Sequence, residues 1–300
     1  MANLVLLLLC FALGLAARRS GAFPADSHKA VTAWVLWVSL PALVFRSIHG
    51  VALERTLVLG AGLLWLVFLV PAVIAVLLLR RDPARARGEL GATVLCSGLC
   101  NTAFVGLPLL EALGGKDVLG PAVVVDQLGA FLALFLFALP FATWLEAGTV
   151  SFRASLEKLG RSPALWALGL ALATRSIDVP PAADTVLARL ADMLSPLAIA
   201  TIGWQLDLRA LQGNGRRLLL GLTWKLVLAP AVVLGVLLLW RGHLGITERV
   251  ILAQAAMAPM VTAGVVATEH KLAPSLAAAF IALGVPLSLV TVSAWWQLSG

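Results

Sequence analysis

The polar residues most suited to binding chemistry in this sequence form a short run with two helix breakers. Asn101 and Thr102 supply an amide and a hydroxyl, and Gly106 and Pro108 follow shortly after. All four lie in an apolar stretch of the length that a membrane-spanning helix needs. Because glycine and proline interrupt a helix, backbone N–H groups and a positive helix end become free beside the amide. Such groups bind carboxylates and other anions.

A second apolar stretch later in the chain has the same character. It contains Gln254, Pro259, Met260, Thr262 and Gly264, so it also combines helix breakers with polar side chains. Interrupted helices at corresponding depth in two halves of a chain indicate a transporter substrate site. The simpler interpretation is that glycine and proline only shape packing and that the polar side chains bond to neighbouring helices.

A carboxylate lies in a further apolar stretch. Asp126 and Gln127 follow a run of valines, where an ionised group is costly unless it is paired or wetted. Asp126 is therefore the first candidate for a proton-coupling or gating group, and Gln127 and Gln254 are grouped with it. The alternative is a structural hydrogen bond to a broken helix.

Basic residues give weaker candidates. Lys225 is assigned to the coupling group, and Arg46 lies late in a span. Both could act as counter-charges or substrate ligands, although long basic side chains near span ends commonly reach back to the membrane surface. Gln205 and Asp207, at the end of another span, are weaker still.

Enzyme and metal-site motifs are missing from the sequence. HExxH, the Walker-type GxxxxGK[ST] and GxSxG do not occur, and the four histidines are isolated. Cys10, Cys96 and Cys100 lie in apolar segments and are expected to pack as small core residues, not to form disulfides or a metal site. We therefore expect no enzyme activity, no ATP-driven pumping by this chain alone, and no metal or cofactor.

The amino-acid composition indicates which kind of structure holds these candidate residues. The chain is 61% apolar and only 12% charged, whereas about a quarter of the residues of a soluble protein are charged. The net charge of +7 is scattered between apolar runs and forms no basic patch with aromatic residues, so no nucleic-acid partner is expected. The sequence thus predicts an all-α membrane protein that is embedded in the lipid bilayer over nearly its whole length.

Ten membrane spans account for the apolar windows. The first is interpreted as a helix and not as a signal peptide, because Arg18 and Arg19 follow the apolar run instead of preceding it. The ten are placed near residues 3–17, 30–48, 57–79, 90–113, 119–142, 162–177, 183–206, 217–240, 246–268 and 274–297.

The distribution of charge sets the orientation. Fourteen lysines and arginines lie in the loops after odd-numbered spans or beside them, and six lie in or near the loops on the other side. Because positively charged loops stay in the cytoplasm, both termini are expected outside, in a multi-pass protein of the inner (plasma) membrane.

The chain contains an internal repeat. Trp65 and Pro71 in the third span recur at the same spacing as Trp224 and Pro230 in the eighth, and spans two and four match seven and nine at similar offsets. An odd number of spans per repeat gives the two halves opposite orientation, as in secondary transporters. The expected organisation is a five-helix repeat over 1–142, a cytoplasmic connecting loop over 143–161 and an inverted five-helix repeat over 162–300.

Several segments resemble the auxin efflux carrier family, which includes plant PIN-type auxin carriers and bacterial carriers of dicarboxylates such as malonate and malate. The stretch from Asn101 to Leu109 (NTAFVGLPL) looks like the Gly-Leu-Pro-Leu segment of the family's fourth span. Residues 40–45, 126–129 and 195–197 with Gly203 are similar to family segments in spans two, five and seven. The resemblance extends over essentially the whole chain.

The resemblance implies a transporter with a scaffold domain and a transport domain, crossed broken helices four and nine, elevator-like alternating access and an organic anion as substrate. The Asn-Pro-Asn signature of the plant members is missing; only Pro259 matches it in the ninth span. The related sodium-coupled bile acid transporters have more acidic and polar coupling sites, so a proton is preferred to Na⁺ as the coupling ion.

The sequence therefore predicts secondary active or facilitative transport of a small organic anion, either a dicarboxylate or an auxin-like carboxylate. Its site combines Asn101, Thr102, Gly106 and Pro108 with Pro259, Met260, Thr262 and Gly264. A second copy of the chain is a candidate partner. The alternatives are a sodium-coupled organic-anion symporter of the bile-acid type and a membrane-embedded ligand sensor.

Overall fold

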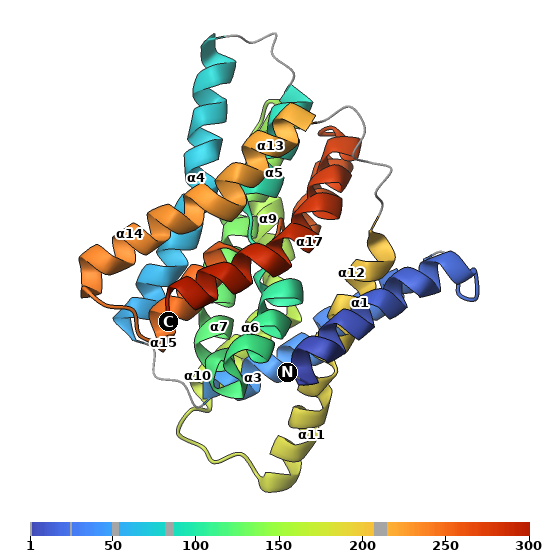
Figure 1. The fold of residues 1–300 in the computed structure, drawn as a ribbon, viewed down its shortest axis with the longest axis vertical. Helices are drawn as coiled ribbons and strands as arrows, with labels where there is room; N and C mark the ends of the chain where they lie inside the picture. Colours follow the sequence, from blue (N-terminus) through green and yellow to red (C-terminus); the bar gives the residue numbers. More distant parts are fainter. Residues whose placement is uncertain (1, 25, 50–53, 82–86, 207–214) are drawn as a thin grey trace.

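The computed structural model describes residues 2–24, 26–49, 54–81, 87–206 and 215–300. Within these ranges the chain is helical and has no β-strand (Figure 1). The α-helices are α1 (Ala2–Ser20), α2 (Ser27–Trp34), α3 (Leu40–His49), α4 (Arg55–Arg81), α5 (Arg87–Gly98), α6 (Leu107–Gly114), α7 (Leu119–Val125), α8 (Leu139–Ala147), α9 (Phe152–Gly160), α10 (Pro163–Ala173), α11 (Pro181–Asp192), α12 (Leu194–Gln205), α13 (Gly215–Thr223), α14 (Ala229–Arg241), α15 (Ile246–Ala255), α16 (Val261–Glu269) and α17 (Pro274–Leu298).

Each of the ten apolar segments coincides with one helix or with consecutive helices. Six helical runs in the described ranges are long and apolar enough to cross a membrane: Ser27–His49, Arg55–Arg81, Lys116–Ala147, Pro181–Gln205, Gly215–Arg241 and Pro274–Leu298. Two shorter apolar helical runs are Thr102–Gly114 and Pro163–Ala173. Large apolar side chains such as Leu239, which is 91% exposed, point outward, as expected for a surface that meets lipid.

Short π-helical turns join several helices into continuous runs, and proline explains most of them. The turns η1 (Val35–Ser39), η2 (Thr102–Gly106), η5 (Leu134–Ala138) and η7 (Trp224–Leu228) each end two residues before a proline. Proline has no N–H and its ring crowds the carbonyl four residues earlier, so the helix widens locally. A fifth π turn, η4 (Asp126–Phe131), has no such proline.

Tryptophan side chains bind carbonyls in two of these turns. The Trp65 indole donates to the carbonyls of Leu128 (2.9 Å) and Gly129 (3.1 Å) in η4. The Trp295 indole donates to the Leu226 carbonyl in η7 at 3.0 Å. Because a widened turn weakens its own backbone hydrogen bonds, these contacts stabilise helix irregularities that apolar surroundings would otherwise disfavour.

The helices pack in two groups. The outer group consists of α1–α3 and α10–α12, in which α1 lies along α12 and α3 packs against α10 and α11 (Figure 1). The inner group consists of α4–α8 and α13–α17 around the run from Lys116 to Ala147, whose apolar window is 67% buried, against 39% for α4. At the α1–α12 contact, a Cβ added to Gly14 or Gly203 would collide with the facing backbone, so glycine allows the close approach.

Two details differ from the sequence expectation. The connecting segment predicted over 143–161 begins inside α8, which continues to Ala147, and it contains the helix α9. On the exposed face of α9, Arg153 pairs with Glu157 one turn later at 3.0 Å, which adds a small stabilisation to this helix. The predicted span 162–177 is shorter than expected, because the helix ends at Ala173.

Candidate functional site

Two interrupted helices meet in the middle of the inner group. The α5 helix ends at Gly98 and helical structure resumes at Thr102, while α15 ends at Ala255 and α16 starts at Val261. We call the two non-helical segments, 99–101 and 256–260, the crossover. Both interruptions that the sequence predicts are therefore present.

Backbone hydrogen bonds join the two segments of the crossover. The Asn101 N–H donates to the Ala258 carbonyl at 2.9 Å, and the Met260 N–H donates to the Leu99 carbonyl at 3.1 Å. This antiparallel pair satisfies groups that the breaks would otherwise leave without partners inside the bilayer. Pro259 lies opposite Cys100 in the pair, where its missing N–H costs no hydrogen bond of the ladder.

Close packing holds the breaks in place. A Cβ on Gly98 would lie 2.8 Å from Phe68 Cδ2, so only glycine lets α4 approach the end of α5. A Cβ on Gly284, in α17, would lie 2.5 Å from Pro259 Cδ. The crossover is thus enclosed by neighbouring helices and not open to lipid.

The helices that resume after the breaks point their N-terminal ends at the crossover. The run η2–α6 begins at Thr102, and α16 begins at Val261. The first turn of any helix has N–H groups without acceptors in that helix and a positive end of the helix dipole. These two ends are the anion-attracting features that the glycine and proline pattern predicts.

Asp126 lies at one of these positive ends. The Thr102 hydroxyl donates to one oxygen of the Asp126 carboxylate, and Gln127 Nε2 donates to the other at 2.7 Å. All three side chains are buried. The structure therefore brings together Thr102, Asp126 and Gln127, which the sequence assigns to two different roles.

Three buried amide atoms near the breaks have no hydrogen-bond partner among the described residues. They are Asn101 Nδ2, Gln127 Oε1 and Gln254 Oε1. The other amide atom of Gln254, Nε2, donates to the Ala122 carbonyl at 3.1 Å, which fixes the side chain. Unpaired buried polar groups are costly, about 1–3 kcal/mol each. One donor and two acceptors are thus buried here without a partner among the described residues.

The other predicted site residues lie in the crossover or in the helices that follow it. A Cβ on Gly106 would lie 2.5 Å from Gln254 Oε1, so Gly106 and Gln254 face each other across the two broken helices. Pro108 is buried as the second residue of α6, and Met260 lies in the crossover. Thr262 lies at the start of α16 and is exposed.

A cavity of about 280 Å³ lies beside α16, between the two groups of helices. Gly264 lines it, and so does Gln205 from the end of α12. Thr268 and Glu269 also line it, and the sequence pattern did not single them out. Asp207, the neighbouring candidate, lies outside the described residues.

The basic candidates have separate partners. Arg46 forms an ion pair with Asp184 of α11, with Nε–Oδ1 at 2.7 Å, so it ties α3 to α11 and does not reach the crossover. Lys225, in η7, is fully buried beside the crossover, with Nζ 2.6 Å from Cys100 Sγ.

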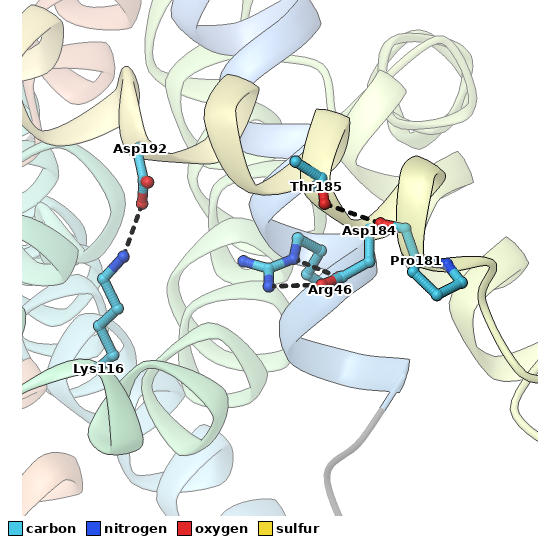
Figure 2. Close-up of polar contacts among 6 residues, drawn as sticks. All are labelled: Arg46, Lys116, Pro181, Asp184, Thr185 and Asp192. Carbon is cyan, nitrogen blue, oxygen red and sulfur yellow. Dashed lines mark hydrogen bonds and ion pairs between the residues drawn. The ribbon is translucent and has the colours of Figure 1, made fainter.

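Two polar contacts link the outer and inner groups. Lys116 Nζ, in the turn η3 (Lys116–Val118), lies 2.9 Å from Asp192 Oδ1 at the end of α11. The Ser195 hydroxyl donates to Glu111 Oε2 at 2.9 Å. Figure 2 shows Lys116 and Arg46 reaching the two ends of α11. No sequence signal indicated these pairs, because the partners lie far apart in the chain.

Apolar helices that surround two interrupted, mutually bonded helices define this protein as a multi-pass membrane transporter. Residues 1–296 match the family model described as "Membrane transport protein". The chain belongs to this family, the auxin efflux carrier or PIN-like transporters, as the sequence resemblance indicated. A comparison with curated protein sequences finds no match.

Proposed function

We propose that this transporter carries a small organic anion, a dicarboxylate such as malonate or malate or an auxin-like carboxylate, by alternating access at the crossover. The observation that carries the proposal is the presence of two helix N-termini at the crossover together with Asn101 Nδ2, a buried amide donor that has no partner among the described residues. Positive helix ends favour a carboxylate, and a free amide donor can bond to one of its oxygens.

In this proposal the chain has ten spans, arranged as two inverted five-helix repeats. The outer group is the scaffold domain, and the inner group is the transport domain that carries the crossover. Support comes from the breaks in spans four and nine, and from the tryptophan contacts, which link span three to span five and span ten to span eight. Both termini would lie outside the inner (plasma) membrane.

The substrate would bind at Asn101, Thr102, Gly106 and Pro108 on one side and at Pro259, Met260, Thr262 and Gly264 on the other. Asn101 Nδ2 is the side-chain donor that has no partner among the described residues. The cavity beside α16 would form part of the route to this site, since it lies between the two groups of helices.

Asp126 would couple transport to protons, with Gln127 and Gln254 as its neighbours. Its carboxylate accepts a hydrogen bond from the Thr102 hydroxyl at the start of a broken helix. A change in the protonation of Asp126 would therefore alter a hydrogen bond at the proposed substrate site. A sodium-coupled symporter of the bile-acid type remains the rival mechanism, and a membrane-embedded sensor is the rival function.

Uptake by purified protein in liposomes tests the proposal. Labelled malonate, malate and an aromatic carboxylate are offered with and without an imposed pH gradient, and in sodium or choline buffer. We expect saturable uptake of at least one carboxylate that rises with the proton gradient and does not require sodium. Saturable binding without uptake would favour the sensor, and uptake that requires sodium would favour the symporter.

Replacing Asn101 by alanine is expected to weaken carboxylate binding about 10- to 100-fold, because a hydrogen bond to a charged group contributes about 1.5–3 kcal/mol. Isothermal titration of the purified protein measures this. Gln297→Ala removes an exposed amide at the end of α17 and serves as the control. Unchanged affinity in the Asn101 variant would remove this amide from the substrate site.

Cross-linking Lys116→Cys to Asp192→Cys with a short, reducible bifunctional thiol reagent is expected to stop transport. The exposed ion pair between these residues is weak, so it can break as the two groups of helices move past each other. Reduction of the cross-link should restore uptake. The native cysteines are buried, and the single-cysteine variants control for them.

The matched control for this cross-link lies within the outer group. Arg46→Cys with Asp184→Cys joins α3 to α11, which move together in the proposal, so the cross-link should leave transport intact. Full activity of the cross-linked 116–192 protein would contradict a sliding motion between the two groups.

A further inference from the structure

Lys225 is the largest charged side chain that is completely buried among the described residues, with 0% exposure. None of the described carboxylates forms an ion pair with it. A buried ammonium without a counter-charge is costly, so its surroundings must supply negative potential.

The partners of Lys225 belong to both interrupted helices. Its Nζ donates to Cys100 Sγ at 2.6 Å, just after α5 ends, and to the carbonyl of Ala255, the last residue of α15, at 3.4 Å. The Cys100 thiol is also directed at the Ala255 carbonyl, at 3.7 Å. One ammonium thus contacts both the carbonyl of the last residue of α15 and the thiol of Cys100, which lies two residues beyond the end of α5.

These ends carry negative potential. The last carbonyls of a helix receive no hydrogen bond from N–H groups of the same helix. The helix dipole adds about half a negative charge at this end. Two such ends converge at the crossover, inside a membrane protein and away from water. Carbonyl groups at unwound membrane helices are also the groups that coordinate sodium or protons in other transporters.

The acidic residue lies at the opposite ends. Asp126 bonds to Thr102 at the start of η2, so the carboxylate is at a positive helix end and the ammonium is at the negative ends. The two side chains share no hydrogen bond or ion pair. Two side chains from neighbouring helices thus flank the crossover: the Asp126 carboxyl group at a positive helix end and the Lys225 ammonium at the negative end of α15.

We propose that the Lys225 ammonium is a built-in counter-cation for the carbonyl ends of α5 and α15, occupying the position that an exchangeable monovalent cation would otherwise need. Resting on the proposed transport function, this inference gives a physical reason why the proposed carrier would not need a metal ion for coupling. Lys225 is a positioning residue in this account: it holds the crossover together and does not touch substrate.

The test measures thermal stability of the full-length purified protein in detergent, which needs no knowledge of the substrate. Lys225→Ala removes the ammonium and leaves space for a small cation, whereas Lys225→Met removes the charge but fills the space. Lys158→Ala, an exposed lysine on α9, is the control. Each protein is compared in choline chloride, sodium chloride and ammonium chloride at equal ionic strength.

We expect Lys225→Ala to melt below the wild-type protein in choline and to regain about 5 °C in ammonium or sodium, with a saturable dependence on concentration. The wild-type protein, the Lys158 control and Lys225→Met should show no difference among the three salts. If Lys225→Ala does not yield folded protein in choline, its recovery on purification in ammonium is the same expected result.

Two results would overturn the proposal. One is a Lys225→Ala protein that is equally stable, or equally unrecoverable, in all three salts. The other is a wild-type protein that is stabilised by sodium or ammonium over choline. In liposomes, Lys225→Ala is expected to lose uptake roughly tenfold or more. Added ammonium should restore part of this uptake. Melting is measured without substrate. The melting experiment therefore still tests the role of Lys225 if the protein does not transport carboxylates.

Discussion

Replacing Asp126 by asparagine is expected to reduce transport about 10- to 100-fold and to make the remaining uptake insensitive to a pH gradient. The carboxylate accepts hydrogen bonds from Thr102 and from Gln127 Nε2 (2.7 Å) in a buried position. Asparagine keeps one acceptor oxygen but turns an amide donor toward one of these two donors. The loss corresponds to about 1.5–3 kcal/mol, as for a hydrogen bond to a charged group.

The pH profile of uptake separates a coupling role from a structural one. A purely structural Asp126 would give a slower variant with the wild-type pH dependence, and that result would contradict proton coupling. Asp117→Asn, an exposed carboxylate in η3 beside the same span, is the matched control and should keep both rate and pH profile.

Replacing Gly284 by alanine is expected to lower stability by about 1–3 kcal/mol and to reduce transport at least tenfold. The new Cβ would lie 2.5 Å from Pro259 Cδ and 2.6 Å from its Cγ. The proline ring is rigid and is held in the crossover by the neighbouring Met260–Leu99 hydrogen bond, so it cannot simply turn away. The collision therefore displaces the crossover itself.

Thermal melting and uptake of the Gly284 variant measure the two effects. Gly235→Ala in α14 is the control, because a Cβ there would meet nothing within 4 Å. Alanine favours helix more than glycine, so the control should be as stable as the wild-type protein or slightly more so. Wild-type transport by the Gly284 variant would show that the crossover tolerates displacement.

The apolar segments and the two breaks could be predicted from the sequence, because their causes are local. Runs of about 20 apolar residues specify membrane helices, and glycine and proline specify where a helix fails. The predicted interruption near Pro259 agrees with the structure, whereas the first interruption covers residues 99–101 and not Asn101–Pro108, because Gly106 and Pro108 lie in the continuous helical run η2–α6. Family membership also agrees with the resemblance over residues 1–296.

The contacts that connect distant segments could not be predicted in this way. Asp126 was singled out, but its bond to Thr102 depends on two spans packing side by side. Cys100 was expected only to pack, yet it lies against Lys225, which is 125 residues away in the chain. Arg46 was considered as a substrate ligand, but its partner Asp184 is set by the packing of α3 on α11.

The hydrogen-bond partners of the charged side chains near the crossover bear on the proposed motion between the two groups of helices. Asp126 and Lys225, which flank the crossover, have their hydrogen-bond partners within the inner group, so in the proposed mechanism they would move together with the site. The two groups are instead joined by the exposed Lys116–Asp192 pair and the Glu111–Ser195 hydrogen bond. Weak contacts of this kind allow relative motion at small cost.

Solute counterflow tests the proposed carrier mechanism most directly. Liposomes that contain the purified protein are loaded with excess unlabelled carboxylate and diluted into a trace of the same labelled compound, with no ion gradient. An alternating-access carrier should accumulate label transiently above the outside concentration, and Asn101→Ala should reduce this overshoot. Saturable binding of the carboxylate without any overshoot would contradict the account.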